Sequence, residues 1–323
     1  MTVLLTGATG FLGSELARQL CDRGERVRVL VRPTSDLRRL SGLDVDVAQG
    51  DVTDRASVTR ALDGVTQVHH VAAMYEIGAS DPARMREVNV GGTTNVLEAA
   101  AERGIPAVHV SSVSAQGPSP AAPVGEEWWA PEPGDSVYAH TKREAHEVFN
   151  RVAGAGASVR AALPVTIYGP DDSSLIGGIM GFLARWPVPV GSFAGSRVSF
   201  VHVADCADGL IHIADKGTDG QSYVLSGQVA TVSEVLALAA RITGRRRPLA
   251  YIPVPVVTAL IRAVRPLVPL VGLSRALLDE TLGMVGTGHW SFTAEKAERE
   301  LGWRARSLED GLRETLDWYR TAR

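Results

Sequence analysis

The sequence predicts an α/β protein with a Rossmann-like, doubly wound parallel sheet and a smaller, mostly helical C-terminal region. Three observations predict this fold class. Short β-rich runs alternate with segments of helical spacing through the first half of the chain. Several runs are apolar at nearly every position, as parallel strands covered on both faces are. Glycines cluster between the first run and the first helix, at the turn where such sheets bind nucleotides.

The expected elements follow one another in a regular order. Strands are expected at 2–7, 26–32, 43–51, 66–73, 106–112 and 158–169. Long helices are expected at 11–24, 82–103 and 136–153. Because crossovers between parallel strands are right-handed, this alternation restricts the sheet to Rossmann-like strand orders.

The regular alternation of strands and helices ends after Gly169. Residues 171–200 contain many glycines and prolines and few charges, whereas 221–227 has the pattern of a strand that returns to the sheet. Helices are expected at 231–244 and 307–320. We therefore expect a dinucleotide-binding domain of residues 1–168, with a returning segment at about 200–227, and a substrate-binding domain of residues 169–323.

Composition restricts the class of protein. The formal net charge of −3 provides no basic surface for nucleic acid. Cys21 and Cys206 cannot form a disulfide framework and suit a reducing, cytoplasmic setting. The first apolar run stops at Leu5, too early for a signal peptide. The most apolar later region, Ile252 to Leu278, contains arginines and prolines, so we interpret it as substrate-domain helices and not a membrane span, with an interfacial helix as the alternative. The histidines show no metal-ligand spacing, so no metal is expected.

The glycine turn predicts a bound dinucleotide. Gly7, Gly10 and Gly13 lie between the first strand and the first helix. Glycine permits a tight turn and lets the backbone approach a pyrophosphate closely. The following helix N-terminus offers N–H groups to that anion. The spacing is G-x-x-G-x-x-G, not the G-x-G-x-x-G of the dehydrogenase fingerprint, but the strand–turn–helix context is the expected one.

The end of the second strand indicates which dinucleotide binds. An NAD site usually has an acid there, and an NADP site an arginine. Arg32 occupies this place, and Thr34 and Ser35 could add hydroxyl donors. NADP(H) is therefore favoured, while NAD(H) remains possible if Asp36 reaches the ribose. Asp51, after the third strand, is expected to border the adenine.

The motifs of the chain are similar to those of one family. It resembles the extended short-chain dehydrogenase/reductases, also described as NAD-dependent epimerases/dehydratases, over nearly its whole length. Within this family it looks closest to the dihydroflavonol-reductase-like and 3β-hydroxysteroid-dehydrogenase-like branch. The motifs are "TGATGFLG" at 6–13, "HVAA" at 70–73, "NVGGT" at 89–93, "SSVSAQG" at 111–117, "YAHTK" at 138–142, "IYGP" at 167–170 and "FVHVAD" at 200–205.

The resemblance implies a role for each matched residue. Tyr138 would be the acid/base, Lys142 its partner and Ser112 the hydroxyl that holds the substrate oxygen, while Asn89 supports the site from a neighbouring helix. Cofactor contacts are expected from Gly7, Thr9, Gly10, Phe11, Leu12, Gly13, Arg32, Asp51, Val52, Ala72, Ala73, Tyr138, Lys142, Pro164 and Val165. Substrate contacts are expected from Met74, Tyr75, Ser112, Ser114, Thr166 and Arg197.

The tyrosine and lysine have a chemical reason to lie four residues apart. This spacing puts both on one helix face. A phenol has a pKa near 10 and is a poor base at neutral pH. An ammonium about 4 Å away is worth roughly 4 kcal/mol at an effective dielectric near 20, which would bring the phenol pKa toward the operating pH. We therefore expect a proton relay of Ser112, Tyr138 and Lys142 beside the nicotinamide.

The residues at positions where relatives contact their substrates favour a hydrophobic substrate. Relatives that bind nucleotide sugars commonly carry R-x-x-N-V-Y-G-P, and Leu163 and Thr166 stand at the two polar positions. No acid follows Ser112, which disfavours dehydration. Arg197 could still bind a phosphate. The run 174–193 holds one charge, and Trp128 and Trp129 precede the catalytic helix, so the walls are expected to be apolar.

We therefore expect an NADP(H)-dependent ketone reductase or alcohol dehydrogenase for a hydrophobic small molecule. An NAD-dependent sugar epimerase that retains its cofactor is the alternative, and a non-enzymatic NADP(H)-sensing regulator is a third possibility. Family members often pair their helices at 82–103 and 136–153 between subunits, so the resemblance also implies a homodimer.

Overall fold

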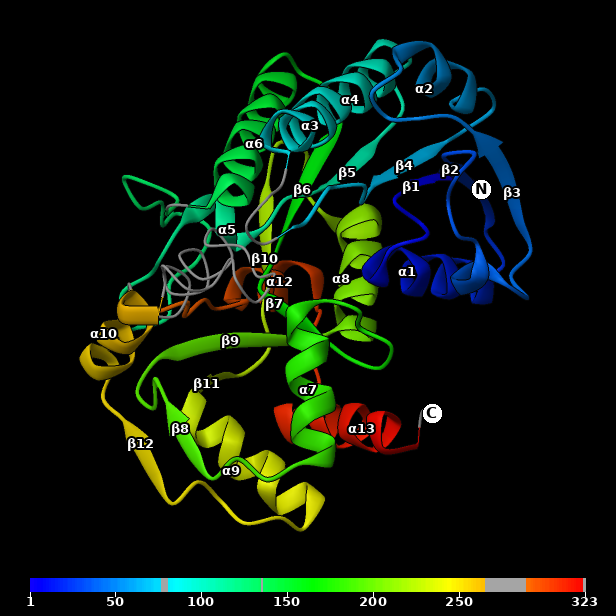
Figure 1. Cartoon of the computed structure of the whole chain (residues 1–323). Coiled ribbons are helices and arrows are strands. Elements are labelled where there is room, and N and C mark those ends of the chain that lie inside the picture. Colours follow the sequence, from blue (N-terminus) through cyan, green and yellow to red (C-terminus); the bar gives the residue numbers. More distant parts are fainter. Residues whose placement is uncertain (77–80, 135, 265–288, 322–323) are drawn as a thin grey trace.

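The computed structural model describes residues 1–76, 81–134, 136–264 and 289–321. Its centre is a seven-stranded, fully parallel sheet of order β10-β6-β5-β4-β1-β2-β3 (Figure 1). The strands are β1 (Thr2–Thr6), β2 (Arg26–Val31), β3 (Val45–Gln49), β4 (Gln67–His70), β5 (Ala107–Val110), β6 (Val159–Pro164) and β10 (Ser222–Leu225). The predicted doubly wound α/β fold is confirmed, and the chain does return to the sheet after the sixth strand.

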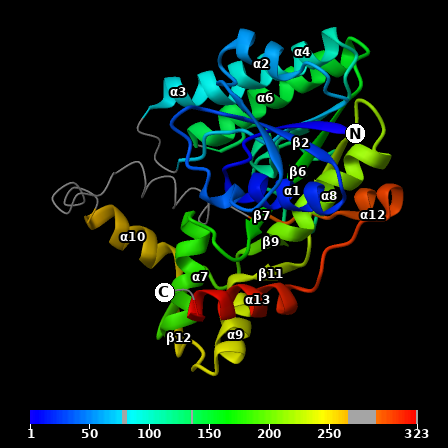
Figure 2. The same cartoon turned by 90° about the vertical axis from the view of Figure 1, so that its right-hand side faces the viewer.

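Helices cover both faces of this sheet. One layer contains α1 (Phe11–Asp22), α8 (Val203–Lys216) and α12 (Glu295–Leu301), whose apolar residues share a core with the strands. The other contains α2 (Arg55–Ala61), α4 (Gly92–Glu102) and α6 (Val137–Gly154). Figure 2 shows the two layers above and below the sheet. Apolar residues on both faces explain why the central strands β1, β5 and β6 are apolar at most positions, whereas β2 and β3, at one edge of the sheet, alternate with polar residues.

The helix expected at 82–103 is one rod with an irregular middle. It consists of α3 (Pro82–Arg86), a π-helical segment (Glu87–Gly91) and α4. Asp81 caps the rod by accepting a hydrogen bond from the N–H of Arg84. A π-helical turn widens the backbone locally and is frequent near functional sites. Here it carries Asn89.

The run expected as one strand at 158–169 is two strands in two sheets. β6 ends at Pro164, and β7 (Thr166–Tyr168) begins after Val165. β7 pairs with β9 (Arg197–His202), which pairs with β11 (Val229–Thr231). The bend is hidden in the sequence because both strands are largely buried and apolar. Pro164 has no N–H to continue a ladder, so the chain can leave the large sheet here.

The remaining elements form the smaller part of the molecule. Its core joins α7 (Leu175–Arg185), α9 (Val232–Thr243) and α13 (Leu308–Thr321) around Tyr168. β8 (Val190–Ser192) and β12 (Ala250–Ile252) form a parallel pair, and α10 (Val254–Val264) follows. The rest of the apolar region at 252–278 lies outside the described residues. No helix among those described is long and apolar enough to cross a membrane.

Candidate active site

A continuous cavity of about 1420 Å³ extends from the glycine turn to α7 and β8. The short α5 (Val113–Gln116) and the start of α6 border its middle. Its wall brings together these predicted residues: Gly7, Thr9, Gly10, Phe11, Leu12, Gly13, Arg32, Asp51, Val52, Ala72, Ala73, Met74, Tyr75, Ser112, Ser114, Tyr138, Lys142, Pro164, Val165 and Thr166. Residues at or just after the carboxyl ends of β1 to β6, together with residues of three helices, thus meet at the carboxyl edge of the sheet, where ligands of such folds bind.

The glycine turn has no room for a side chain at two of its glycines. Gly7 has a φ of +75°, and a Cβ there would lie 2.6 Å from the amide nitrogen of Ala72. A Cβ on Gly13 would lie 2.1 Å from the carbonyl oxygen of Gly7. Larger residues would therefore collide with the backbone of the turn. Gly10 is the N-cap of α1, so the first N–H groups of this helix face the cavity beside it.

The adenine end of the cavity is rich in arginine. Arg32 lies exposed at the end of β2, and Asp36 is paired with Arg38 at 2.6 Å instead of facing the ribose position. Arg84 also lines the cavity, and its Nη2 lies 3.1 Å from Oδ2 of Asp51. Burial disfavours ionisation of Asp51, but hydrogen bonds from Thr53 and the nearby arginines outweigh it and lower the pKa of Asp51. Sequence reasoning missed Arg84, which lies 33 positions from Asp51 and is brought there only by the fold.

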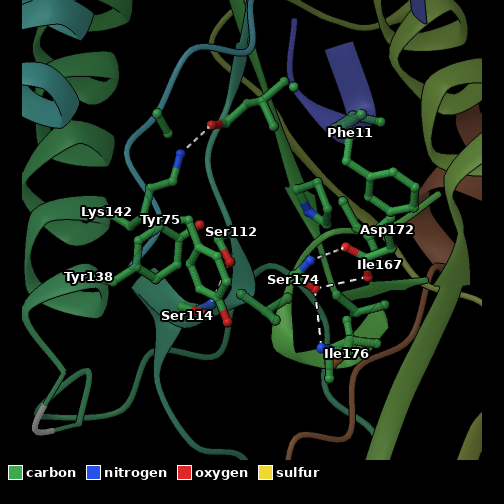
Figure 3. Close-up of a pocket in the computed structure, with 18 of the residues that line it drawn as sticks. Phe11, Tyr75, Ser112, Ser114, Tyr138, Lys142, Ile167, Asp172, Ser174 and Ile176 are labelled. Carbon is green, nitrogen blue, oxygen red and sulfur yellow. Dashed lines mark hydrogen bonds between the residues drawn. The ribbon is translucent and has the colours of Figure 1, made fainter. Parts of the chain in front are cut away.

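The three predicted catalytic side chains converge in the middle of the cavity (Figure 3). Ser136 caps α6 by accepting a hydrogen bond from the N–H of Ala139, which fixes the start of the helix that carries Tyr138. Ser112 caps α5 by accepting from the N–H of Ser114 at 3.0 Å. The ring of Tyr75 meets that of Tyr138 edge to face at 4.8 Å. In Figure 3 these groups face Phe11, Ile167 and Ile176 across the cavity.

The expected depression of the tyrosine pKa is absent from this geometry. Lys142 is 3% exposed, and its Nζ donates to the carbonyl oxygen of Val110 at 2.8 Å, 5.9 Å from the centre of the Tyr138 ring. Burial raises the pKa of Tyr138, with Tyr75 adding to the shift and hydrogen bonding with Ser112 opposing it. Burial also lowers the pKa of Lys142 to about 8. The expectation was wrong for the free protein because desolvation of the phenol exceeds the stabilisation expected from the ammonium.

Asn89 braces the site from behind and is not among the described residues that line the cavity. Its Oδ1 accepts from the N–H of Met74 at 2.7 Å. Its Nδ2 donates to the carbonyl of Met74 and to Oγ1 of Thr141, both at 3.0 Å. Asn89 therefore ties the segment after β4 to α6, which is the arrangement of a positioning residue.

The far end of the cavity is predominantly apolar. Its lining there includes Ile176, Ile179, Met180, Leu183, Val188, Val190, Phe193, Phe200, Val235 and Leu236. Ser174, which caps α7 and bonds to Asp172, is a polar exception. Such a wall favours a hydrophobic ligand with few polar anchors.

Two sets of expected substrate residues lie elsewhere. Arg197 is exposed at the start of β9 and does not appear among the described lining residues. Trp128 donates from its indole to the carbonyl of Pro118, and Trp129 packs on His146 at 4.9 Å. Both tryptophans thus support the loop before α6 rather than the cavity wall. Within the described ranges, no cluster of three or more His, Cys, Asp or Glu could hold a metal ion.

The fold and site define an enzyme class: a dinucleotide-binding oxidoreductase scaffold with a Ser, Tyr and Lys set beside the cofactor cavity. Residues 3–226 match the model of the NAD dependent epimerase/dehydratase family. The chain belongs to this family, the extended short-chain dehydrogenase/reductases, as its motifs indicated.

Similar proteins agree with this assignment. The chain is 36% identical over 258 residues to Sterol demethylase protein B of Methylococcus capsulatus, covering 78% of each chain. It is 31% identical to Ceramide reductase of Caulobacter vibrioides, over 99% of this chain and 95% of that one. A crystal structure of gox2253 superposes with a TM-score of 0.85 at 30% identity, over 99% of this chain and 98% of the other.

Proposed function

We propose that this enzyme is an NADP(H)-dependent ketone reductase, or in reverse an alcohol dehydrogenase, for a hydrophobic small molecule. The observation that carries the proposal is the continuity of the cavity, from the glycine turn past Tyr138 to the apolar wall of α7 and β8. A carbonyl held between Ser112 and Tyr138 would extend its remaining bulk along that wall. Relatives named as a ceramide reductase and a sterol demethylase protein support a lipid-like substrate.

The residues suggest how the reaction proceeds. The glycine turn and the start of α1 would hold a reduced dinucleotide, which would supply the hydride for the carbonyl carbon. Ser112 donates a hydrogen bond to the carbonyl oxygen, which becomes more negative as the reaction proceeds. Tyr138 then gives its phenolic proton to that oxygen. Because burial raises the pKa of Tyr138, the phenol holds its proton at neutral pH and suits the direction of reduction.

The preference for NADP(H) follows from the arginines at the adenine end. Arg32 and Ser35 line the cavity where a 2′-phosphate would lie, and Arg84, on α3, lines it as well. The acid that could bind a free ribose instead, Asp36, is engaged by Arg38. Paired donors and cations of this kind suit a phosphate better than a hydroxyl.

The alternative, an NAD-dependent sugar epimerase, has less support. Leu163 is fully buried in β6, and Arg197 lies outside the described lining, so neither offers a contact to a diphosphate-linked sugar. A tightly retained NAD and no net turnover of NADPH would nevertheless favour it. A non-catalytic regulator would bind NADPH without using Tyr138.

We further propose that the chain divides functionally after Tyr168, and that it forms a homodimer through α4 and α6, as the resemblance implies. The β10 and α8 segment returns to the dinucleotide-binding part. The mass in solution from light scattering tests the dimer, and a monomer would contradict it.

The decisive experiment is NADPH consumption with a panel of ketones that share a carbonyl and differ in apolar bulk. We expect turnover to rise with apolar bulk. A Tyr138→Phe variant should lose nearly all turnover and keep its NADPH affinity. Equal turnover in this variant, or turnover only with nucleotide sugars, would contradict the proposal.

A further inference from the structure

α7 presents an apolar stripe to the outside of the molecule. Leu175, Ile179 and Phe182 are spaced by four and three residues, which places them on one helix face, and Trp186 follows directly after the end of α7 in an extended conformation. They are 42%, 43%, 50% and 61% exposed. The opposite face packs into the core of the smaller part through Met180, Leu183 and Ala184. A helix that is apolar all round is normally enclosed on every side, so the exposed stripe requires a partner.

The stripe continues onto neighbouring elements. β8 begins directly after α7, and its Val190 is 46% exposed. The N–H of Leu249, which is 86% exposed, donates to the carbonyl of Pro189 at 2.9 Å. On α10, Val256 and Leu260 lie four residues apart and are 47% and 56% exposed. Figure 2 shows α7, β12 and α10 along one side of the molecule. We call these residues and the stripe the apolar face.

Arginines are the only Lys, Arg, Asp or Glu residues in the segments that supply the apolar face, and Asp172, just before α7, lines the same hollow as Phe182 and Trp186. Arg245 donates from Nη2 to the carbonyl of Ala184 at the end of α7, at 3.2 Å. Arg246 and Arg247 follow it and are exposed. The segments that supply the face, 173–204 and 235–264, contain no aspartate or glutamate, although the whole chain has a net charge of −3. An apolar surface rimmed by arginine matches a layer of anionic lipid headgroups over acyl chains.

The apolar face also borders the cavity. Ile179 and Val190 line the cavity, so the cavity interior accounts for part of the surface that leaves them 43% and 46% exposed. A molecule embedded in a lipid layer against this face would therefore be next to the wall of the substrate end.

We propose that the apolar face docks peripherally on an anionic lipid bilayer, and that hydrophobic substrate passes from the bilayer into the cavity between α7 and β8. The docking rests on the surface alone, whereas the passage of substrate rests on the proposed reductase function. Trp186 and Phe182 would enter the headgroup boundary, where aromatic side chains are favoured, and Arg245 to Arg247 would meet the phosphates. Trp186 and Phe182 are absent from the described cavity lining, so they can be changed without altering the catalytic groups.

The test is cosedimentation of the full chain with vesicles, in the absence of cofactor and substrate. The vesicles are phosphatidylcholine alone or phosphatidylcholine mixed with phosphatidylglycerol. We expect binding to the mixed vesicles that weakens as salt increases. A double Phe182→Ser and Trp186→Ser variant should bind at least about 10-fold more weakly. A double Arg246→Gln and Arg247→Gln variant should no longer distinguish the two vesicle types.

The matched control removes two exposed apolar side chains from the dinucleotide-binding part. A double Leu37→Ser and Val47→Ser variant changes residues that are 40% and 43% exposed and should bind as the natural chain does. The proposal is overturned if the natural chain binds neither vesicle or if this control weakens binding equally. It is also overturned if the Phe182 and Trp186 changes alter the mass in solution and leave vesicle binding intact, since the face would then join two copies.

A second readout separates this proposal from the reductase function. With a water-soluble ketone and NADPH, the Phe182 and Trp186 variant should turn over as the natural chain does. With a ketone dissolved in vesicles, its turnover should fall. Vesicle binding without any ketone turnover would refute the reductase and leave the docking intact. Ketone turnover without vesicle binding would refute only the docking.

Discussion

The ammonium group of Lys142 is hydrogen-bonded to the main-chain carbonyl of Val110, with 2.8 Å between Nζ and the oxygen. This contact holds the lysine at the end of β5, beneath the cavity and one helical turn from Tyr138. The same burial that fixes the ammonium makes its charge costly, and it lowers the pKa of Lys142 to about 8. The site therefore contains a lysine that loses its proton close to physiological pH.

The first prediction concerns stability as a function of pH. Since the pKa of Lys142 is lower in the folded chain than its ordinary value of 10.5, the unfolded chain binds more protons between pH 8 and pH 10.5, and stability should rise with pH there. A Lys142→Met variant has no ammonium at this position and so lacks this contribution to the pH dependence of stability. The free energy of unfolding of the natural chain, measured relative to this variant in urea, should increase by about 2 kcal/mol from pH 7.5 to pH 10. A difference that stays constant or decreases would contradict a buried, destabilised ammonium.

The second prediction concerns the state of the catalytic phenol. Burial raises the pKa of Tyr138, so its tyrosinate should not form below pH 10 in the cofactor-free protein. The difference in tyrosinate absorbance between the natural chain and Tyr138→Phe should stay flat up to that pH. The control is Tyr75→Phe, which removes the neighbouring phenol and keeps its ring. It shows whether the absorbance difference comes from Tyr138 alone. A titration step near pH 7 would instead support the lowered pKa of Tyr138 that the sequence predicted.

The third prediction concerns the cofactor. Replacing Arg32 with serine removes a cation from the position proposed for the 2′-phosphate and should weaken NADPH binding by about 10- to 100-fold. NADH affinity should change by less than about twofold, because NADH has no phosphate there. Arg26→Ser, at the exposed start of the same strand, is the matched control. Fluorescence titration with both cofactors measures the effect, and equal losses for NADPH and NADH would argue against a 2′-phosphate contact.

The fourth prediction concerns the brace behind the site. Asn89→Asp keeps the size of the side chain but cannot donate to Met74 and Thr141, so it should cost about 3 kcal/mol of unfolding free energy. The turnover of ketone should fall as well, because the segment holding Met74 and Tyr75 loses its tie to α6. Asn95→Asp removes one donor, to the carbonyl of Val52 at 2.9 Å, and should cost no more than about 1 kcal/mol. Urea unfolding compares the two; equal costs would mean that Asn89 has no special bracing role.

The parts of the fold that depend on local chemistry were predictable. Most strands of the large sheet are apolar runs, and the glycine turn needs small residues because Gly7 and Gly13 approach the backbone within van der Waals distance. The spacing of Tyr138 and Lys142 on α6 places both in the cavity wall. These features can be predicted because the residues that determine them lie within a few positions of one another.

Features that depend on distant residues were not predictable. The bend at Val165 has no local pattern, since β6 and β7 are both apolar. The pairing of Arg84 with Asp51 and of Asn89 with Met74 arises only once the sheet assembles. The pKa of Tyr138 was misjudged for a similar reason, because the degree of burial of a phenol depends on the walls around it and not on its neighbour in sequence.

The chain leaves the large sheet after β6 and returns to it as β10, which limits how the molecule can be divided. The segment that forms α7 and β8 is inserted between two strands that are hydrogen-bonded neighbours, Leu225 lying opposite Pro164. A gene fragment ending at Tyr168 would thus encode a sheet without its border strand. Removal of all residues after Tyr168 would therefore also remove β10, and the large sheet would end at β6.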